Sequence, residues 1–312
     1  MTAPQQSLPL TVGDLRGSRR RRQRETIIRS LFFAAAATAV LISVLILLVL
    51  AGRAFSFITQ VDPASLFSGS WRPRANSYDL PSIIAGTFVI AGIAMVVATP
   101  LGLGAAIFLA EYASPRVRST VKPILEILAA IPSVVLGFFT LTVLSPSVVD
   151  AICPGATPIF NMGAAGLAVG VLITPLVASI AEDAMHAVPS SLREASFGLG
   201  ARRRTTSIRV VFPAAVSGIV AALIVGFSRA LGETMIVSIV AGGVGGAVFT
   251  LNPCLPGQTM TAAMTAQAVG SDQAAGGLAT ASLFFVGMLL FLMTLALNLL
   301  SERFVRRIRT AL

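Results

Sequence analysis

The chain has 312 residues, of which 55% are hydrophobic and only 12% are charged, whereas a soluble domain carries roughly 25% charged residues. This composition excludes an ordinary soluble protein and indicates a membrane protein. The two cysteines exclude a disulfide-dense scaffold and a cysteine-based metal site, and the net charge of +10 must reflect either a nucleic-acid partner or membrane topology.

Residues 1–29 form a basic, mostly polar tail that precedes the first apolar segment. The apolar run at 31–52 is longer than the roughly 7–15 residues of a signal-peptide core, and a signal peptide would not follow so long a tail. We therefore expect a retained membrane helix at 31–52 and not a cleaved signal.

A membrane helix needs about 20 mainly apolar residues, and six segments meet this condition. They lie at 31–52, 82–110, 121–144, 163–181, 212–240 and 278–300. The prediction is an all-α polytopic membrane protein in which residues 30–301 form one six-span domain, followed by a short basic tail at 302–312. Pro100 and Pro175 fall inside the second and fourth spans, where proline favours a kink.

The basic residues gather on one side of this topology. Most of them lie in the N-terminal tail, in the connections after the second and fourth spans and at the C-terminus, whereas the 146–162 and 241–277 connections contain no Lys or Arg. Cytoplasmic loops are enriched in Lys and Arg, so we expect both termini in the cytoplasm and the chain in a bacterial inner membrane. The asymmetry accounts for the net charge, so the expected partner is the lipid membrane and not nucleic acid.

The connection after the fourth span, 187–211, has the features of a docking loop. Ser191 and Glu194 have the spacing of a capping box, and Pro189 suits the entry of a helix. This short helix is expected to bend at Gly198 or Gly200, and a second basic helical piece then leads to Pro213. Small residues beside Glu194 form a compact knob that fits a cleft on another protein.

The same loop resembles the EAA loop of ABC importer permeases. That pattern is E-A-A, three residues, G, nine residues, I-x-L-P, and here Glu194-Ala195-Ser196, Gly200 and Phe212-Pro213 keep its spacing, with Ser196, Val210 and Phe212 as mild departures. The resemblance implies a type I (MetI-like) permease fold, with a coupling helix that sits in a groove of a cytoplasmic ATPase subunit. The alternative is an ordinary capped helix at the membrane surface.

The chain has no ATP site of its own in this interpretation. A P-loop requires G-x-x-x-x-G-K-[ST], and the single lysine, Lys122, is followed by proline. We therefore expect a subunit that is not an enzyme and holds no cofactor, with ATP and Mg²⁺ bound by partner ATPase subunits.

Arg229 and Glu233 interrupt the apolar fifth span. At a spacing of four residues on one helix their side chains share a face, and ionisable groups inside spans usually mark a pathway. The guanidinium fork matches oxyanions, so Glu233 is expected to hold Arg229 until an anion arrives or to reject anions that carry no proton. Ser228 and Thr234 add hydroxyls nearby. The alternative is an interhelical salt bridge or a snorkelling arginine with no substrate role, since a buried ion pair can also fix helix register.

Arg229-Ala-Leu-Gly-Glu233-Thr-Met resembles the R-A-x-G-E-T-M segment of phosphate-importer permeases. Further stretches that resemble this group lie at 100–112, 131–137 and 182–195, so the resemblance covers about 83–240. It implies inorganic phosphate as substrate, a second homologous six-span permease (PstA-type), a dimer of PstB-type ATP-binding subunits and an extracytoplasmic PstS-type binding protein. Met235 and the long basic N-terminus resemble the PstC-type subunit more than the PstA-type.

Three other functions stay open from the residues alone: a permease for sulfate, molybdate or phosphonate, a non-transporting membrane scaffold for an ATPase, and a stand-alone channel or carrier. His186 with Glu182 and Asp183 could form a metal site, but these residues equally suit a solvated helix end, and we expect no metal. Glu111 is interpreted as a residue at a span boundary, and Glu126 as one that makes polar contacts near the cytoplasmic face and does not carry protons.

Cys153 and Cys254 both fall in connections expected on the outer, oxidising side, where a disulfide is permitted. A bond would require their Cα atoms to lie within about 7 Å. The sequence leaves open whether they are bonded.

Overall fold

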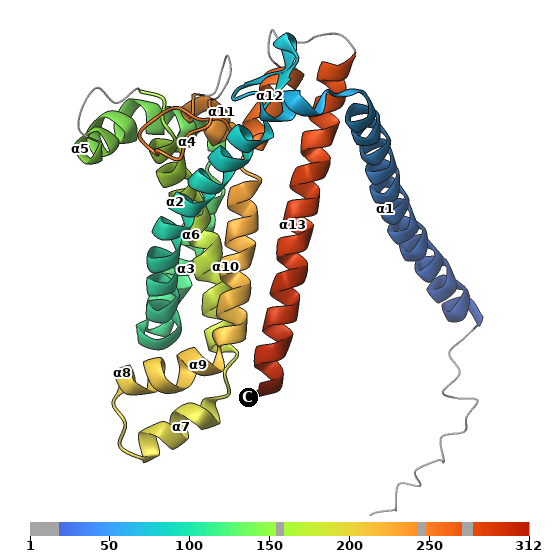
Figure 1. The fold of residues 1–312 in the computed structure, drawn as a ribbon. Coiled ribbons are helices and arrows are strands. Elements are labelled where there is room, and N and C mark those ends of the chain that lie inside the picture. Colours follow the sequence, from blue (N-terminus) through green and yellow to red (C-terminus); the bar gives the residue numbers. More distant parts are fainter. Residues whose placement is uncertain (1–18, 154–158, 243–247, 270–276, 312) are drawn as a thin grey trace, which may run out of the picture. The chain divides into compact units, whose positions relative to one another are not determined.

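The computed structural model describes residues 19–153, 159–242, 248–269 and 277–311, and in these ranges the chain is almost entirely helical (Figure 1). The only strands within them are β1 (Trp71–Arg72) and β2 (Ser77–Tyr78), which form a small antiparallel hairpin. The all-α prediction is confirmed. The chain divides into two compact units, Met1–Gly52 and Arg53–Leu312.

The helices follow one another along the chain with few long connections. The α-helices are α1 (Arg19–Gln60), α2 (Leu80–Ile107), α3 (Pro115–Ala129), α4 (Ser133–Phe139), α5 (Asp150–Ile152), α6 (Met162–His186), α7 (Ser190–Gly198), α8 (Arg203–Thr206), α9 (Phe212–Ala214), α10 (Val216–Leu231), α11 (Met235–Val240), α12 (Met260–Val269) and α13 (Leu278–Ala311). Short 3₁₀ helices are η1 (Pro63–Phe67) and η2 (Pro73–Ala75), and π-helical segments are η3 (Phe108–Tyr112), η4 (Thr140–Val149) and η5 (Ser207–Val211).

Five helical segments within the described residues are long and apolar enough to cross a membrane. They are Gln23–Gln60, Leu80–Tyr112, Ser133–Ile152, Met162–His186 and Leu278–Arg303. A sixth is obtained if Arg203–Ala214 and Val216–Leu231, which meet at an angle of 71°, count as one bent span. By length and composition the structure therefore offers up to the six spans that the sequence predicts.

The third span differs from its predicted bounds of 121–144. The structure has two helices here, because α3 ends at Ala129 and α4 begins at Ser133. Pro132 lacks a backbone donor and disfavours helical geometry in the preceding residue, which explains the break. The apolar segment long enough to span then continues to Ile152 through η4.

The two terminal helices extend into the predicted tails. α1 already begins at Arg19, inside the basic tail predicted for 1–29, and residues 1–18 of that tail lie outside the described residues. α13 continues beyond the predicted end of the last span and through the basic C-terminal segment to Ala311. Pro100 and Pro175 lie inside α2 and α6, which continue past them.

The tightest packing in the second unit is between α2 and α6. Gly166 and Gly170, four residues apart on α6, face α2 so closely that a Cβ at Gly170 would lie 2.9 Å from the Ala94 carbonyl oxygen and 2.8 Å from Val97. Small residues at this spacing let helix backbones approach in membranes, where dispersion contacts drive association. The buried side chains around this contact are mostly alanine, isoleucine and valine. α2 and α6 therefore form a closely packed pair, against which α10 and α3 also pack.

The short helices of the second unit gather at the two ends of its long helices. Figure 1 shows α7, α8 and α9 at one end of α2, α6 and α10, and α4, α5, α11 and α12 toward the opposite end. The two candidate functional regions lie at opposite ends of these long helices. The docking loop lies at the end with α7, α8 and α9, and the residues around Glu233 lie toward the end with α11 and α12.

Candidate functional site

The predicted fifth span, 212–240, is not one continuous helix. α10 ends at Leu231, Gly232 caps it, and α11 starts only at Met235, so residues 232–234 form a break between the two helices. Arg229 lies on the last turn of α10 and Glu233 lies in the break. The prediction that both residues lie on one continuous helix is therefore wrong, although the two side chains still meet.

The Arg229–Glu233 pair is asymmetric. One guanidinium nitrogen lies 3.8 Å from Glu233 Oε2, which is within reach of an ion pair but longer than a hydrogen bond. The Arg229 side chain is 56% exposed at the surface of the chain, whereas the Glu233 side chain is 4% exposed. The carboxylate is thus fixed in the protein, and the guanidinium is free to turn toward another group.

Glu233 is held from two further sides. Its Oε1 accepts a hydrogen bond from the Ile236 amide at 3.5 Å, on the first turn of α11. Its backbone carbonyl accepts one from Thr261 Oγ at 2.7 Å, on α12. Thr261 also hydrogen-bonds to Thr259 at 2.9 Å. Sequence reasoning missed Thr261, because nothing in the 241–277 connection indicates that part of it folds back against Glu233.

The two predicted hydroxyl groups point to other partners. Ser228 Oγ lies 3.2 Å from Asn298 Oδ1 on α13, and Thr234 Oγ donates to the Gly232 carbonyl at 3.2 Å inside the break. The structure therefore brings Arg229 and Glu233 together, and directs Ser228 toward α13 and Thr234 toward its own turn.

The docking loop folds as two short helical segments. α7 runs from Ser190, with Pro189 as its N-cap, and among the described side chains none caps its first turn. The predicted capping box is therefore wrong: the helix begins before Ser191, which places Ser191 and Glu194 too far into the helix to cap it. Glu194 and Ala195 are exposed on its surface.

Gly200 makes the turn between the two segments. It has φ of +78°, a left-handed conformation that suits glycine, and its amide donates to the Phe197 carbonyl at 2.9 Å. The Ala201 amide donates to the Ser196 carbonyl at 3.1 Å, which completes a Schellman motif. Ser196 Oγ lies 2.9 Å from Thr206 Oγ, so a buried hydrogen bond joins α7 to α8.

The outer face of α7 combines charge with exposed apolar side chains. Phe197 is 46% exposed and Leu199, the residue beside Gly200, is 90% exposed; they follow the exposed Glu194 by three and five residues in the chain. Large apolar side chains grouped at a surface mark contact sites for other proteins. After α8, the chain continues through η5 to Pro213 and the 71° bend at the start of α10.

A second polar cluster joins α3 to α6. Lys122 Nζ lies 2.8 Å from Glu182 and 2.7 Å from Asp183, and Arg118 pairs with the buried Glu182 and contacts the His186 ring. A hydrogen bond from Lys122 to Asp183, and with a smaller effect one to Glu182, raises the pKa of the Lys122 ammonium. This side chain therefore stays charged at neutral pH. Among the described residues, no group of three or more His, Cys, Asp and Glu is placed to hold a metal ion.

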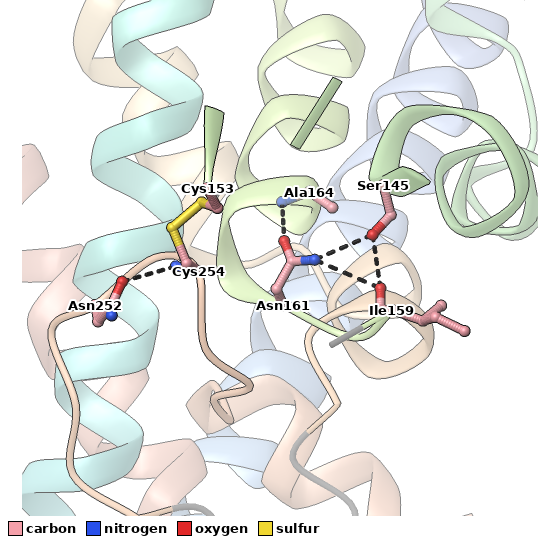
Figure 2. The surroundings of a disulfide bond; sticks show 7 residues. All are labelled: Ser145, Cys153, Ile159, Asn161, Ala164, Asn252 and Cys254. Atoms are coloured by element: carbon pink, nitrogen blue, oxygen red, sulfur yellow. Dashed lines mark hydrogen bonds between the residues drawn. A yellow bond between two sulfur atoms is a disulfide. The ribbon is translucent and has the colours of Figure 1, made fainter. Parts of the chain in front are cut away.

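Cys153 and Cys254 form a disulfide, shown in Figure 2, with their Cα atoms 5.9 Å apart. The bond joins the end of α5 to the segment that precedes α12. The question that the sequence left open is therefore answered in favour of a bonded pair.

The disulfide lies beside the start of α6. Asn161 caps this helix by accepting a hydrogen bond from the Ala164 amide at 2.7 Å, and it donates to Ser145 Oγ at 3.0 Å (Figure 2). The Gly163 amide donates to the carbonyl of Pro253, next to Cys254, at 2.7 Å. The disulfide thus holds a loop that satisfies backbone donors at the α6 N-terminus, which otherwise have no partner inside the helix.

The chain is similar in sequence to membrane components of binding-protein-dependent transport systems. The family model for the binding-protein-dependent transport system inner membrane component matches residues 98–310. The phosphate transport system permease protein PstC of Pasteurella multocida is 31% identical over 261 residues, which cover 78% of this chain and 79% of that protein. PstC 1 of Mycobacterium tuberculosis is 31% identical, with 84% and 85% covered, and the probable ABC transporter permease protein YqgH of Bacillus subtilis is 35% identical, with 64% and 65% covered.

Solved structures share the fold at low sequence identity. A bacterial ABC transporter involved in the import of the acidic polysaccharide alginate matches with a TM-score of 0.60 at 15% identity, covering 92% of this chain and 99% of that one. The MetNI methionine ABC transporter in an inward-facing conformation matches with a TM-score of 0.53 at 20% identity, covering 73% and 93%. These likenesses confirm the predicted MetI-like permease fold. The docking loop and the Arg229–Glu233 pair both lie inside residues 98–310, which the family model matches.

Proposed function

The chain belongs to the family of binding-protein-dependent transport system inner membrane components, and we propose that it is the permease subunit of an ATP-driven importer of inorganic phosphate. The observation that carries this proposal is the exposed guanidinium of Arg229 beside the buried carboxylate of Glu233. Relatives named as phosphate transport permeases, each about 30% identical over most of their length, support phosphate over sulfate, molybdate or phosphonate.

The proposed pathway uses the asymmetry of this pair. Phosphate binds the Arg229 fork through two of its oxygens, and a protonated phosphate donates a hydrogen bond to Glu233. A fully ionised sulfate has no proton to donate there and meets the carboxylate with like charge. The contact between Arg229 and Glu233 is longer than a hydrogen bond, so an arriving anion displaces it at low cost. Weak, transient binding suits a pathway, because the ion must also leave.

The exposure of Arg229 also indicates that the pathway needs a second subunit. The side chain lies at the surface of the chain, and a bare guanidinium in lipid is costly. We propose that a second six-span permease, of the PstA type, covers this surface and that the anion passes between the two chains.

The remaining partners follow from the family and from the docking loop. The family description names a binding protein, and an extracytoplasmic PstS-type protein is the proposed source of phosphate. A PstB-type ATPase dimer, which holds ATP and Mg²⁺, is proposed to receive α7 through Glu194, Ala195 and the exposed Phe197 and Leu199. The chain is a multi-pass inner-membrane subunit, and both termini are proposed to lie in the cytoplasm.

Uptake in cells whose only high-affinity phosphate route uses this chain tests the proposal. Labelled phosphate and labelled sulfate are supplied in parallel, and the amount of chain in the membrane is measured. We expect saturable phosphate uptake without sulfate uptake, and the substrate assignment is overturned if only sulfate enters.

The same assay tests the docking loop. Glu194→Lys should abolish uptake while the chain stays in the membrane, because it reverses a charge on the docking face. Thr205→Lys, which adds a positive charge at an exposed position of α8, is the control and should transport normally. Normal uptake by Glu194→Lys would show that the ATPase does not bind α7 through this residue.

A further inference from the structure

Glu111 is a buried acid at the end of α2 that the pathway does not use. It lies in η3, its side chain is 5% exposed, and sequence reasoning treated it only as a boundary residue. A buried carboxylate is costly unless it is paired and hydrogen-bonded. The residues that pair with Glu111 therefore indicate its role.

Arg193, on α7, supplies most of these contacts. Its Nε and Nη2 donate to Glu111 Oε1 at 3.2 and 3.0 Å. Its Nη1 donates to the Val188 carbonyl at 2.6 Å, and Nη2 also donates to the Met185 carbonyl at 2.8 Å. Ser207, in η5, donates to the second oxygen of Glu111 at 3.3 Å.

One arginine thus joins three elements. It pairs with the acid at the end of α2, and it donates to carbonyls at and just beyond the C-terminal turn of α6, where backbone acceptors lack helical partners and a cation is favoured. It belongs itself to α7. The Ser207 contact adds η5, the other half of the docking loop. The Arg193 side chain is 19% exposed, so most of this network is shielded from solvent.

The neighbouring residue on α7 faces the other way. Glu194 is exposed on the proposed docking face, whereas Arg193 points back to η3, at the end of α2, and to the C-terminal turn of α6. The same short helix therefore presents a docking face on one side and an anchor on the other. α2 and α6 are in turn packed through Gly166 and Gly170, so a displacement of one is transmitted to the other.

We propose that Arg193 and Glu111 are positioning residues that make α7 move together with the ends of α2 and α6. This inference rests on the proposed function, because it assumes that an ATPase displaces α7. When the ATPase moves the docking face, the fork of Arg193 transfers the displacement to the two packed helices, and through them to α10 and the Arg229–Glu233 pair. Without the fork, α7 follows the ATPase while the helices stay behind.

The experiment measures coupling in proteoliposomes that hold the complete complex with its binding protein, ATPase subunits and second permease. Phosphate accumulated and ATP hydrolysed are recorded together for the unaltered complex, for Glu111→Gln and for Arg204→Gln. Arg204 is an exposed arginine of the same loop and serves as the control. We expect Glu111→Gln to lower the phosphate moved per ATP by about fivefold or more, with ATP hydrolysis still stimulated by the binding protein.

Arg193→Lys tests the geometry with a smaller change. It keeps the charge but loses the planar fork that reaches Glu111 and both carbonyls at once. The phosphate moved per ATP should therefore lie between the values for the unaltered complex and for Glu111→Gln. The inference is overturned if both variants keep the unaltered ratio, or if transport and hydrolysis fall in proportion. If the unaltered complex moves no phosphate with ATP, the proposed function has failed and not this inference alone.

Discussion

Arg229 and Glu233 form an ion pair whose two partners lie in different environments, one exposed and one buried. The carboxylate is buried and held by Ile236 and by the α12 helix through Thr261, whereas more than half of the guanidinium side chain is exposed. A pair that served only to fix helix register would be expected to bury both partners. The exposed arginine is the feature that favours a role toward an arriving anion.

Replacing Arg229 tests this role. Arg229→Gln should lower phosphate uptake about tenfold or more, because hydrogen bonds to a charged group are worth about 1.5–3 kcal/mol. Arg229→Lys keeps the charge without the fork and should retain more uptake. Labelled phosphate uptake, corrected for the amount of chain in the membrane, provides the measurement. Unchanged uptake in Arg229→Gln would mean that the pair is structural.

At the scale of elements, the docking loop depends on one backbone conformation. The Schellman motif at Gly200 sets the direction in which α8 leaves α7, and the Ser196–Thr206 hydrogen bond holds the two together. The residues of the EAA pattern therefore divide into two roles. Glu194 and Ala195 form surface, whereas Ser196 and Gly200 shape the turn that supports it.

Two glycines of this loop provide a matched comparison. Gly200→Ala places a Cβ in a left-handed conformation, at a cost of about 1–2 kcal/mol, and should lower uptake by distorting the docking face. Gly198→Ala lies in the last turn of α7, where a Cβ would meet no described atom within 4 Å, and should be neutral. Uptake and membrane level are measured for both. Equal behaviour of the two variants would contradict the role of the turn.

The elements also show which features the sequence could predict. Hydrophobic runs of about 20 residues predicted the helical architecture, because length and apolarity decide whether a helix can span a membrane. Interruptions within these runs were harder to predict. The break around Pro132 was missed because the apolar run continues through it, and the break at 232–234 was missed because Gly232 and Thr234 are tolerated in membrane helices.

The contacts of the candidate site were only partly predictable. The Arg229–Glu233 contact follows from local spacing, which survives the break in the helix. Contacts from distant parts of the chain have no such local signal. Thr261 reaches Glu233, and Arg193 reaches Glu111, only because α12 and α7 fold back against other helices. The capping box failed for a local reason, since Pro189 starts α7 earlier than the pattern implied.

In the second unit as a whole, the closely packed helices α2 and α6 have different contacts at their two ends. At one end, the Glu111–Arg193 network joins α7 to α2 and α6. At the other end, the Cys153–Cys254 disulfide and Asn161 hold the connections that cover the α6 N-terminus. We interpret the first end as the moving, ATPase-facing side and the second as a fixed outer rim.

The disulfide ties together distant parts of the chain, because it joins cysteines that are 101 residues apart in sequence. The double variant Cys153→Ser/Cys254→Ser should be less stable by about 2–5 kcal/mol. Thermal unfolding in detergent, with and without a reductant, measures the effect. A reductant should lower the Tm of the unaltered chain and leave the double variant unchanged. A Tm of the unaltered chain that does not respond to reductant would contradict a stabilising bond.

Accumulation of radiolabelled phosphate in proteoliposomes shows whether this chain forms an ATP-driven phosphate pathway that uses Arg229. The complete complex is reconstituted with ATP enclosed, and the binding protein and phosphate are added outside. We expect accumulation that requires enclosed ATP, is not inhibited by excess sulfate and is largely lost in Arg229→Gln. Accumulation without ATP would indicate a carrier or channel, and accumulation of sulfate in place of phosphate would contradict the proposed substrate.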